Sequence, residues 1–212
     1  MKLNRFSILA LLFATIFVNG VRADDSLSAL MQRMRSEQAV RIAYQETRTL
    51  ALMDQPWRGS GYMYSLPPDT MLKEQLQPER LLMAIVGGDM YYYDPGNDVR
   101  HQAALDEDNP MSLNIAVFKA LMMADRKLLE RMYAVDFSVQ PEQWVLRLTA
   151  KHEPDSGFGI EISGLPQQQP KRIVVEQADG DSSVFDLRKD AEGGEVAADA
   201  ERLLQELLDS EQ

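Results

Sequence analysis

Apolar and polar residues alternate along much of the chain, which is the period of half-buried β-strands. From Val40 the alternation places Val40, Ile42 and Tyr44 on one face. The same pattern predicts further strands over 59–65, 71–77, 80–86, 90–93, 144–149, 158–162, 173–175 and 184–188. Two proline residues after Leu66 end the second strand, because proline cannot donate a ladder hydrogen bond. The segment 87–89 has the composition of a hairpin turn.

Helical spacing of apolar residues replaces this alternation in four places. A helix is predicted over 26–37, and Asn109-Pro110 is a strong start for a second helix that carries Ile115 and Leu121. Further helices are predicted over 125–133 and in the tail beyond residue 190. The segment from about 110 to 133 is too apolar to stand in water, so we expect it to cover the concave face of a sheet.

The order of these elements predicts an α+β fold with an antiparallel sheet, since strands do not alternate with helices as in βαβ units. A closed barrel and a strongly curved open sheet both satisfy the pattern. The tail 191–212 is rich in Ala and Glu and forms a separate acidic helical segment in this division of the chain, after a domain over 24–190.

The first 23 residues have the features of a secretory signal peptide. Lys2 and Arg5 precede a short apolar run, and Val21-Arg22-Ala23 supplies small residues where a signal peptidase cleaves. The run is too short for a membrane anchor, and no later segment is apolar enough to span a bilayer. We therefore expect a free, soluble protein outside the cytoplasm after cleavage.

The amino-acid composition limits the classes of partner that we expect. The leader holds three of the 22 basic residues and none of the 33 acidic ones, so the mature chain has 19 basic against 33 acidic residues and a formal charge of −14. Phosphate backbones repel such a chain, so nucleic acid is not an expected partner. The chain has no cysteine, which excludes disulfides, and 12 methionines, which suit both ordinary cores and adaptable apolar surfaces.

Motifs for covalent chemistry, metals or cofactors are not found. The sequence has no Gly-x-Ser-x-Gly elbow and no glycine-rich phosphate loop. The two histidines, His101 and His152, are too far apart to form a metal site by spacing, and Asp179-Gly180-Asp181 is better explained as a hairpin turn than as a calcium loop. A hydrolase that depends on one of the histidines stays a minor alternative, and we expect a binding protein without cofactor.

Four motifs in order resemble the LolA-like family of periplasmic lipoprotein carriers. Residues 41–47 (RIAYQET) resemble the first strand of the family, and 61–69 (GYMYSLPPD) the second strand ending at proline. Residues 85–95 (IVGGDMYYYDP) are similar to the family's D-G-x-x-L-W-x-Y-D-P hairpin, and 176–182 (EQADGDS) to its closing hairpin. The resemblance spans about 26–188 and implies an incomplete antiparallel β-barrel whose open concave side is covered by helices.

The resemblance also implies a cavity for acyl chains, no catalysis and a monomeric carrier. The cargo would be an acylated lipoprotein or a glycolipid, received from an inner-membrane export system and delivered to an outer-membrane acceptor. This sequence departs from the family at Leu66 and Pro67, where the lipoprotein carriers have an arginine before the proline. The departure favours a divergent paralogue with a different acylated cargo.

Alternation and the resemblance together select candidate cavity residues. These are Ile42, Tyr44, Tyr62, Tyr64, Leu82, Tyr92, Phe118, Met122, Trp144, Leu146, Phe158 and Ile160. A strand that slips by one residue would reverse its face, so the selection depends on register. A second reading is a periplasmic lipid-sensing or regulatory module built on the same sheet, with the acidic tail as its contact surface and no role in transport.

Overall fold

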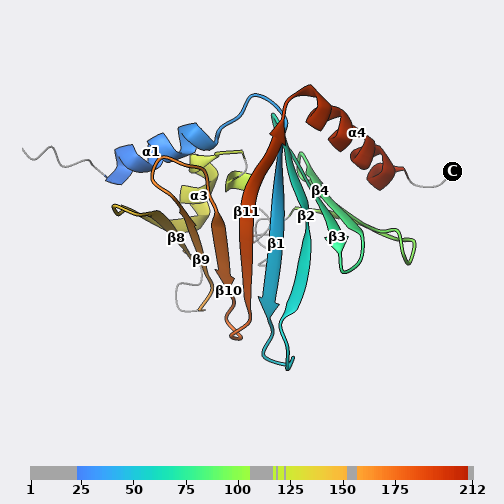
Figure 1. Cartoon of the computed structure of the whole chain (residues 1–212), viewed down its shortest axis with the longest axis horizontal. Helices are drawn as coiled ribbons and strands as arrows, with labels where there is room; N and C mark the ends of the chain where they lie inside the picture. The colour runs from blue at the N-terminus through green and yellow to red at the C-terminus, as the bar shows by residue number, and fades with distance from the viewer. Residues whose placement is uncertain (1–22, 106–116, 118, 122, 152–156, 210–212) are drawn as a thin grey trace, which may run out of the picture.

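The computed structural model describes residues 23–105, 117, 119–121, 123–151 and 157–209. Within these residues, all strands pair antiparallel in one eleven-stranded sheet of order β6-β5-β4-β3-β2-β1-β11-β10-β9-β8-β7 (Figure 1). The edge strands β6 and β7 do not pair with each other, so the sheet is curved and open. The predicted α+β class with an incomplete barrel is confirmed, and the closed barrel is not what forms.

The strands follow the predicted alternation with small changes at their ends. The bounds are β1 Val40–Thr49, β2 Trp57–Leu66, β3 Thr70–Gln77, β4 Leu81–Val86, β5 Asp89–Asp94, β6 Val99–Ala104, β7 Tyr133–Val139, β8 Trp144–Ala150, β9 Gly159–Gly164, β10 Arg172–Glu176 and β11 Ser182–Glu192. Helix α1 spans Ala23–Met34, α3 Arg126–Met132 and α4 Gly194–Leu208. The helix predicted over 26–37 therefore begins and ends three residues earlier.

The first strand of the chain, β1, lies in the middle of the sheet. β1 pairs with β2 on one side and with β11 on the other, so the first hairpins build the sheet outward to β6 and the later ones return from β7 to the centre. The crossover between the two halves contains α3, whose first turn is capped by Asp125, since its carboxylate accepts a hydrogen bond from the Leu128 amide at 3.1 Å. This crossover delivers helical residues to one face of the sheet.

One face of the sheet, here called the inner face, packs against α1, α3 and the residues Val117, Ala120 and Leu121. Its core joins Leu30 of α1 and Leu129 of α3 to Tyr44, Met63 and Trp144 of the strands. Figure 1 shows α1 and α3 together beside β8 and β9. The expectation that the apolar segment before residue 133 covers the concave face is confirmed for the part of it that the structure describes.

The other face, here called the outer face, is covered by α4. Leu203 and Leu207 of α4 pack against Tyr64, Leu72 and Leu82. Three arginines add polar anchors: Arg80 forms a two-pronged ion pair with Glu206, Arg100 donates to the carbonyls of Glu206 and Leu207 at 2.9 Å each, and Arg41 bridges Asp190 and Asp199. Within the acidic tail, α4 is therefore a helix that packs on the outer face of the sheet.

Two strands were not predicted, and both lie at an edge. β6 is exposed along most of its length and carries polar residues on both faces, and β7 follows α3 without an intervening turn. No helix within the described ranges has the length and apolar content needed to cross a membrane. Residues 1–22, which hold nearly all of the predicted signal peptide, lie outside the described residues.

Candidate functional site

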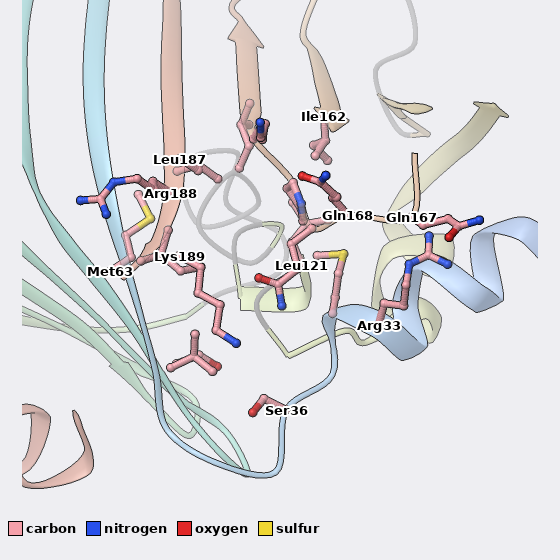
Figure 2. A pocket seen from close by; sticks show the side chains of 18 residues that line it. Arg33, Ser36, Met63, Leu121, Ile162, Gln167, Gln168, Leu187, Arg188 and Lys189 are labelled. Carbon is pink, nitrogen blue, oxygen red and sulfur yellow. The ribbon is translucent and has the colours of Figure 1, made fainter. Parts of the chain in front are cut away.

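A pocket of about 520 Å³ opens on the inner face, between the end of α1, the 165–171 loop that joins β9 to β10, and the adjoining parts of β1 and β11 (Figure 2). Its volume lies within the range of roughly 300–1,000 Å³ that small-molecule sites occupy. The pocket therefore has the size and the position of a binding site between the sheet and its covering helix.

The pocket floor is apolar because the register of five strands points apolar side chains to one place. Ile42 of β1 lies opposite Met63 of β2 and opposite Lys189 of β11. Leu187 follows on the same face of β11, two residues before Lys189, and Ile162 and Ile173 complete the floor from β9 and β10. Met63 and Ile162 are buried, whereas Ile42 and Leu187 remain half-buried at the opening. Such a floor is complementary in polarity to a hydrocarbon chain.

The pocket rim is polar and positively charged. It includes Ser36, the glutamines of the 167–169 segment, and four cations: Arg33, Lys171, Arg188 and Lys189. The Trp144 indole donates its Nε1 hydrogen to the Gln168 carbonyl at 3.1 Å, which holds this segment against the sheet. Gly164 makes the contact possible, since a Cβ there would lie 2.6 Å from the Trp144 ring. Trp144 thus fixes the position of the 167–169 segment of the rim.

A second, smaller cavity of about 170 Å³ continues along the inner face. Its lining includes four methionines, Met63, Met71, Met83 and Met90, together with Ile85, Phe185 and Lys73. Met63 belongs to both cavities, so they adjoin through its side chain. Methionine is unbranched and polarizable, so this wall can adapt to hydrocarbon chains of different shape.

A buried ion pair stands beside the methionine cavity. The Glu46 carboxylate, 1% exposed, accepts a hydrogen bond from the Lys73 ammonium at 2.8 Å and another from Arg48. Burial lowers the pKa of Lys73, and the Glu46 carboxylate offsets part of that effect. The ammonium also lies 4.7 Å from the centre of the Tyr44 ring, and burial raises the pKa of the Tyr44 phenol. The inner wall therefore holds charge in a largely dry region.

The predicted cavity residues lie in different parts of the structure. Ile42 lines the larger pocket. Tyr44, Trp144, Leu146, Phe158 and Ile160 belong to the inner core or pack against it without lining either cavity, whereas Tyr62, Tyr64 and Leu82 lie on the outer face under α4. Tyr92 is half-buried and outside both cores, with its ring 5.9 Å from that of His101. Phe118 and Met122 lie outside the described residues.

The placement of Tyr62 and Tyr64 corrects the predicted face of β2. Both were expected beside Ile42, but the register pairs Tyr62 with Ala43 and Tyr64 with Arg41, so they share the outer face. Met63, between them, takes the inner position. The same correction applies to Leu82 in β4, which alternation left ambiguous because this strand is apolar at every position. The pocket residues Met63, Leu187, Arg33, Lys171 and Lys189 were not predicted.

Replacing Tyr44 with phenylalanine is expected to stabilise the protein by about 1 kcal/mol. The side chain is 2% exposed, and its hydroxyl has no hydrogen-bond partner among the described residues. Removing a buried hydroxyl that lacks a partner removes a desolvation cost without losing a bond. Urea denaturation at pH 7 measures the change. A stability loss of the same size would mean that the hydroxyl is hydrogen-bonded in solution.

Several solved structures are similar to that of this chain. The structure is similar to a LolA superfamily protein from Nitrosomonas europaea (12% identity, 78% of this chain and 91% of that chain, TM-score 0.45). It is also similar to a domain described as an outer membrane lipoprotein-sorting protein from Vibrio parahaemolyticus (13%, 85% and 99%, 0.45) and to the Pseudomonas aeruginosa MucA/MucB complex (16%, 85% and 60%, 0.43). No curated protein matches the chain.

A family model assigns the chain directly. The model described as "outer membrane lipoprotein carrier protein LolA-like" matches residues 20–166, which is more than half of the chain and includes α1, α3 and the strands β1–β9. The inner-face pocket lies between elements of this matched region and the strands β10 and β11 that follow it. The chain belongs to the LolA-like family of outer membrane lipoprotein carrier proteins.

Proposed function

We propose that this protein is a periplasmic carrier that takes acyl chains of a lipid or lipoprotein into the inner-face pocket and ferries them from the inner to the outer membrane. The apolar floor of the 520 Å³ pocket, continued by the methionine cavity, is the observation that carries the proposal. Carriage requires binding and release only, so the protein performs no covalent chemistry. An inner-membrane export system supplies the cargo, and an outer-membrane acceptor receives it.

The energy of transfer is consistent with this shape. Burial of each methylene contributes about 0.8 kcal/mol, so a sixteen-carbon chain gains roughly 12 kcal/mol over water. A bilayer offers the same chain a similar gain, so uptake and release exchange one apolar environment for another. A half-open pocket with an adaptable methionine wall keeps this exchange near balance, because it binds many chain shapes without holding one rigidly.

Native mass spectrometry of the mature protein purified from its own periplasm tests the proposal. We expect about one acylated species per protein, and extraction of the bound lipid identifies the cargo class. A control sample stripped of lipid should take up a fluorescent fatty acid again. An unliganded mass together with no uptake of the fluorescent fatty acid would contradict the proposal.

Transfer between vesicles separates a carrier from a lipid-sensing module. Donor vesicles with a labelled lipid and unlabelled acceptor vesicles are mixed with increasing amounts of protein. A carrier raises the transfer rate in proportion to its concentration. A sensor binds the same lipid without raising the rate, and that result would favour the regulatory alternative.

A further inference from the structure

We propose that the pocket selects a lipid with a phosphate-bearing head group, which Arg33, Lys171 and Lys189 hold at the rim while the acyl chain lies on the apolar floor. The inference rests on the proposed function and names the class of its ligand. It follows from the distribution of charge around the pocket, from the partners of the rim cations, and from the direction in which their side chains point.

The charge at the rim is opposite to that of the chain. The protein has 33 acidic and 22 basic residues, yet the described residues that line the pocket include Arg33, Lys171 and Lys189, besides the outward-pointing Arg188, and no carboxylate. Ser36 and the glutamine side chains of 167–169 add neutral hydrogen-bonding groups. An excess of cations around one apolar opening, in a chain with excess negative charge, gives that opening a local preference for anions.

Two of the rim cations are not committed to neighbours. Within the described part of the chain, neither the Arg33 guanidinium nor the Lys171 ammonium has a hydrogen-bond or ion-pair partner. Lys189 pairs with Glu192 at 2.6 Å, although both side chains are about half exposed. Other cations of the sheet are engaged, as Lys73 is with Glu46 on the inner face and Arg80 with Glu206 on the outer face. Arg33 and Lys171 are therefore available to a ligand.

The side chains are placed to act on one head group. Figure 2 shows Arg33 directed from α1 toward the 167–168 segment, and Lys189 extending from β11 toward α1, so the pocket lies between them. Lys189 shares its strand face with Leu187, whereas Arg188 points the other way. The Lys171 carbonyl accepts a hydrogen bond from the Leu187 amide at 2.7 Å, which places Lys171 beside the apolar floor.

A phosphate ester fits this rim better than a carboxylate. Three separated cations and several amides offer donors from α1, β11 and the 165–171 loop, and a phosphate presents oxygens in several directions, whereas a carboxylate presents two in one plane. Arginine and lysine are the side chains that proteins use for phosphate recognition. The ligand class is thus an acyl glycerol phosphate or a larger lipid that contains one.

Matched lipids test the inference. Monomyristoyl glycerol, the same molecule with a phosphate ester, and myristic acid compete with a fluorescent fatty acid for the full mature protein, below micelle-forming concentrations. We expect the phosphate lipid to bind about tenfold more tightly than the neutral one, as one or two charge-assisted hydrogen bonds would give. The preference should shrink as ionic strength rises, because the rim cations are exposed.

Charge-reversal variants locate the preference. In R33E/K171E the phosphate preference should disappear, whereas the affinity for monomyristoyl glycerol changes less than twofold. The control R58E/K127E makes the same change in net charge at two exposed positions outside the pocket and should keep the preference. Thermal melting checks that both variants are folded. We expect them to fold because all four substituted side chains are exposed.

The outcomes separate this inference from the proposed function. Equal affinity of the wild-type protein for phosphate and neutral lipids would overturn the phosphate assignment and leave the carrier proposal standing. Myristic acid binding as tightly as the phosphate lipid would also overturn it. Loss of the preference in R58E/K127E would show a general charge effect and overturn the role of the rim. No uptake of any of the three lipids would overturn the proposed function itself.

Discussion

Replacing Ile42 with tryptophan is expected to weaken acyl-chain binding by about tenfold or more, with the sheet still folded. Ile42 is half-buried at the opening of the larger pocket and lies opposite Met63. An indole there fills space that the ligand would occupy. If it displaces two methylenes of the chain, the loss is about 1.6 kcal/mol, which corresponds to more than tenfold in affinity.

Titration with a fluorescent fatty acid measures the effect, and circular dichroism checks the fold. The control is Tyr62→Trp, which introduces the same side chain one strand away. Tyr62 lies on the outer face, with its ring 5.0 Å from the Arg41 guanidinium, so its replacement should leave uptake within twofold of wild type. Normal uptake by the Ile42 variant together with lost uptake by the Tyr62 variant would contradict the assignment of the faces.

In β2 the alternation of apolar and polar residues does not predict which face of the strand points inward. A strand covered on one side has one apolar face, but β2 is covered by helices on both sides. Tyr62 and Tyr64 look like the stronger apolar set, yet α4 covers them from outside. Opposite Tyr44, β2 has Gly61, where a Cβ would lie 2.0 Å from the Glu74 carbonyl oxygen, so that position must be glycine for β3 to approach.

The two edge strands, β6 and β7, escaped prediction from the sequence for different reasons. β7 carries a readable alternation in Tyr133, Val135, Phe137 and Val139, but Tyr133 also fits the helical spacing of α3, which ends one residue earlier. β6 has no such pattern, because it is exposed and its register is set by pairing with β5. Local periodicity cannot reveal a strand whose stability comes from its neighbour alone.

The rim residues of the pocket could not be predicted from local sequence patterns. Arg33 and Lys171 are separated by most of the chain, and only the return of β11 to β1 at the centre of the sheet brings α1 and the 165–171 loop together. The apolar floor could be anticipated in part, since Ile42 was predicted from the alternation of β1. The charges that would select a ligand depend on topology, which alternation does not encode.

Replacing Glu46 with leucine is expected to cost about 3 kcal/mol of unfolding free energy at pH 7. The variant leaves the Lys73 ammonium, whose side chain is 16% exposed, without its counter-ion. The Tyr44 and Phe185 rings, 4.7 and 5.4 Å away, offset only part of this cost. Arg48, the other partner of Glu46, is 39% exposed and can turn to water while it stays stacked on Trp57.

The loss should become smaller as the pH rises, and this dependence identifies its cause. Burial already lowers the pKa of Lys73 from its ordinary value of 10.5, and removal of the Glu46 carboxylate lowers it further. Between the lowered pKa and 10.5 the unfolded chain binds more protons than the folded one, so the stability of the variant rises with pH in that window. Urea denaturation at pH 7 and pH 9 measures both values.

The double variant E46L/K73M and an exposed pair complete the test. With both charges gone, apolar side chains fill the site, and the unfolding free energy should return to within about 1 kcal/mol of wild type, because the buried pair contributes little net stability once its desolvation is counted. Glu161→Leu breaks the exposed pair with Arg147, where the two side chains are 43% and 55% exposed, and should cost less than about 1 kcal/mol at either pH. Two results would contradict this account: a loss of unfolding free energy in E46L that does not change with pH, or a loss that persists in E46L/K73M. Either would mean that Glu46 stabilises the protein through packing and not by balancing the charge of Lys73.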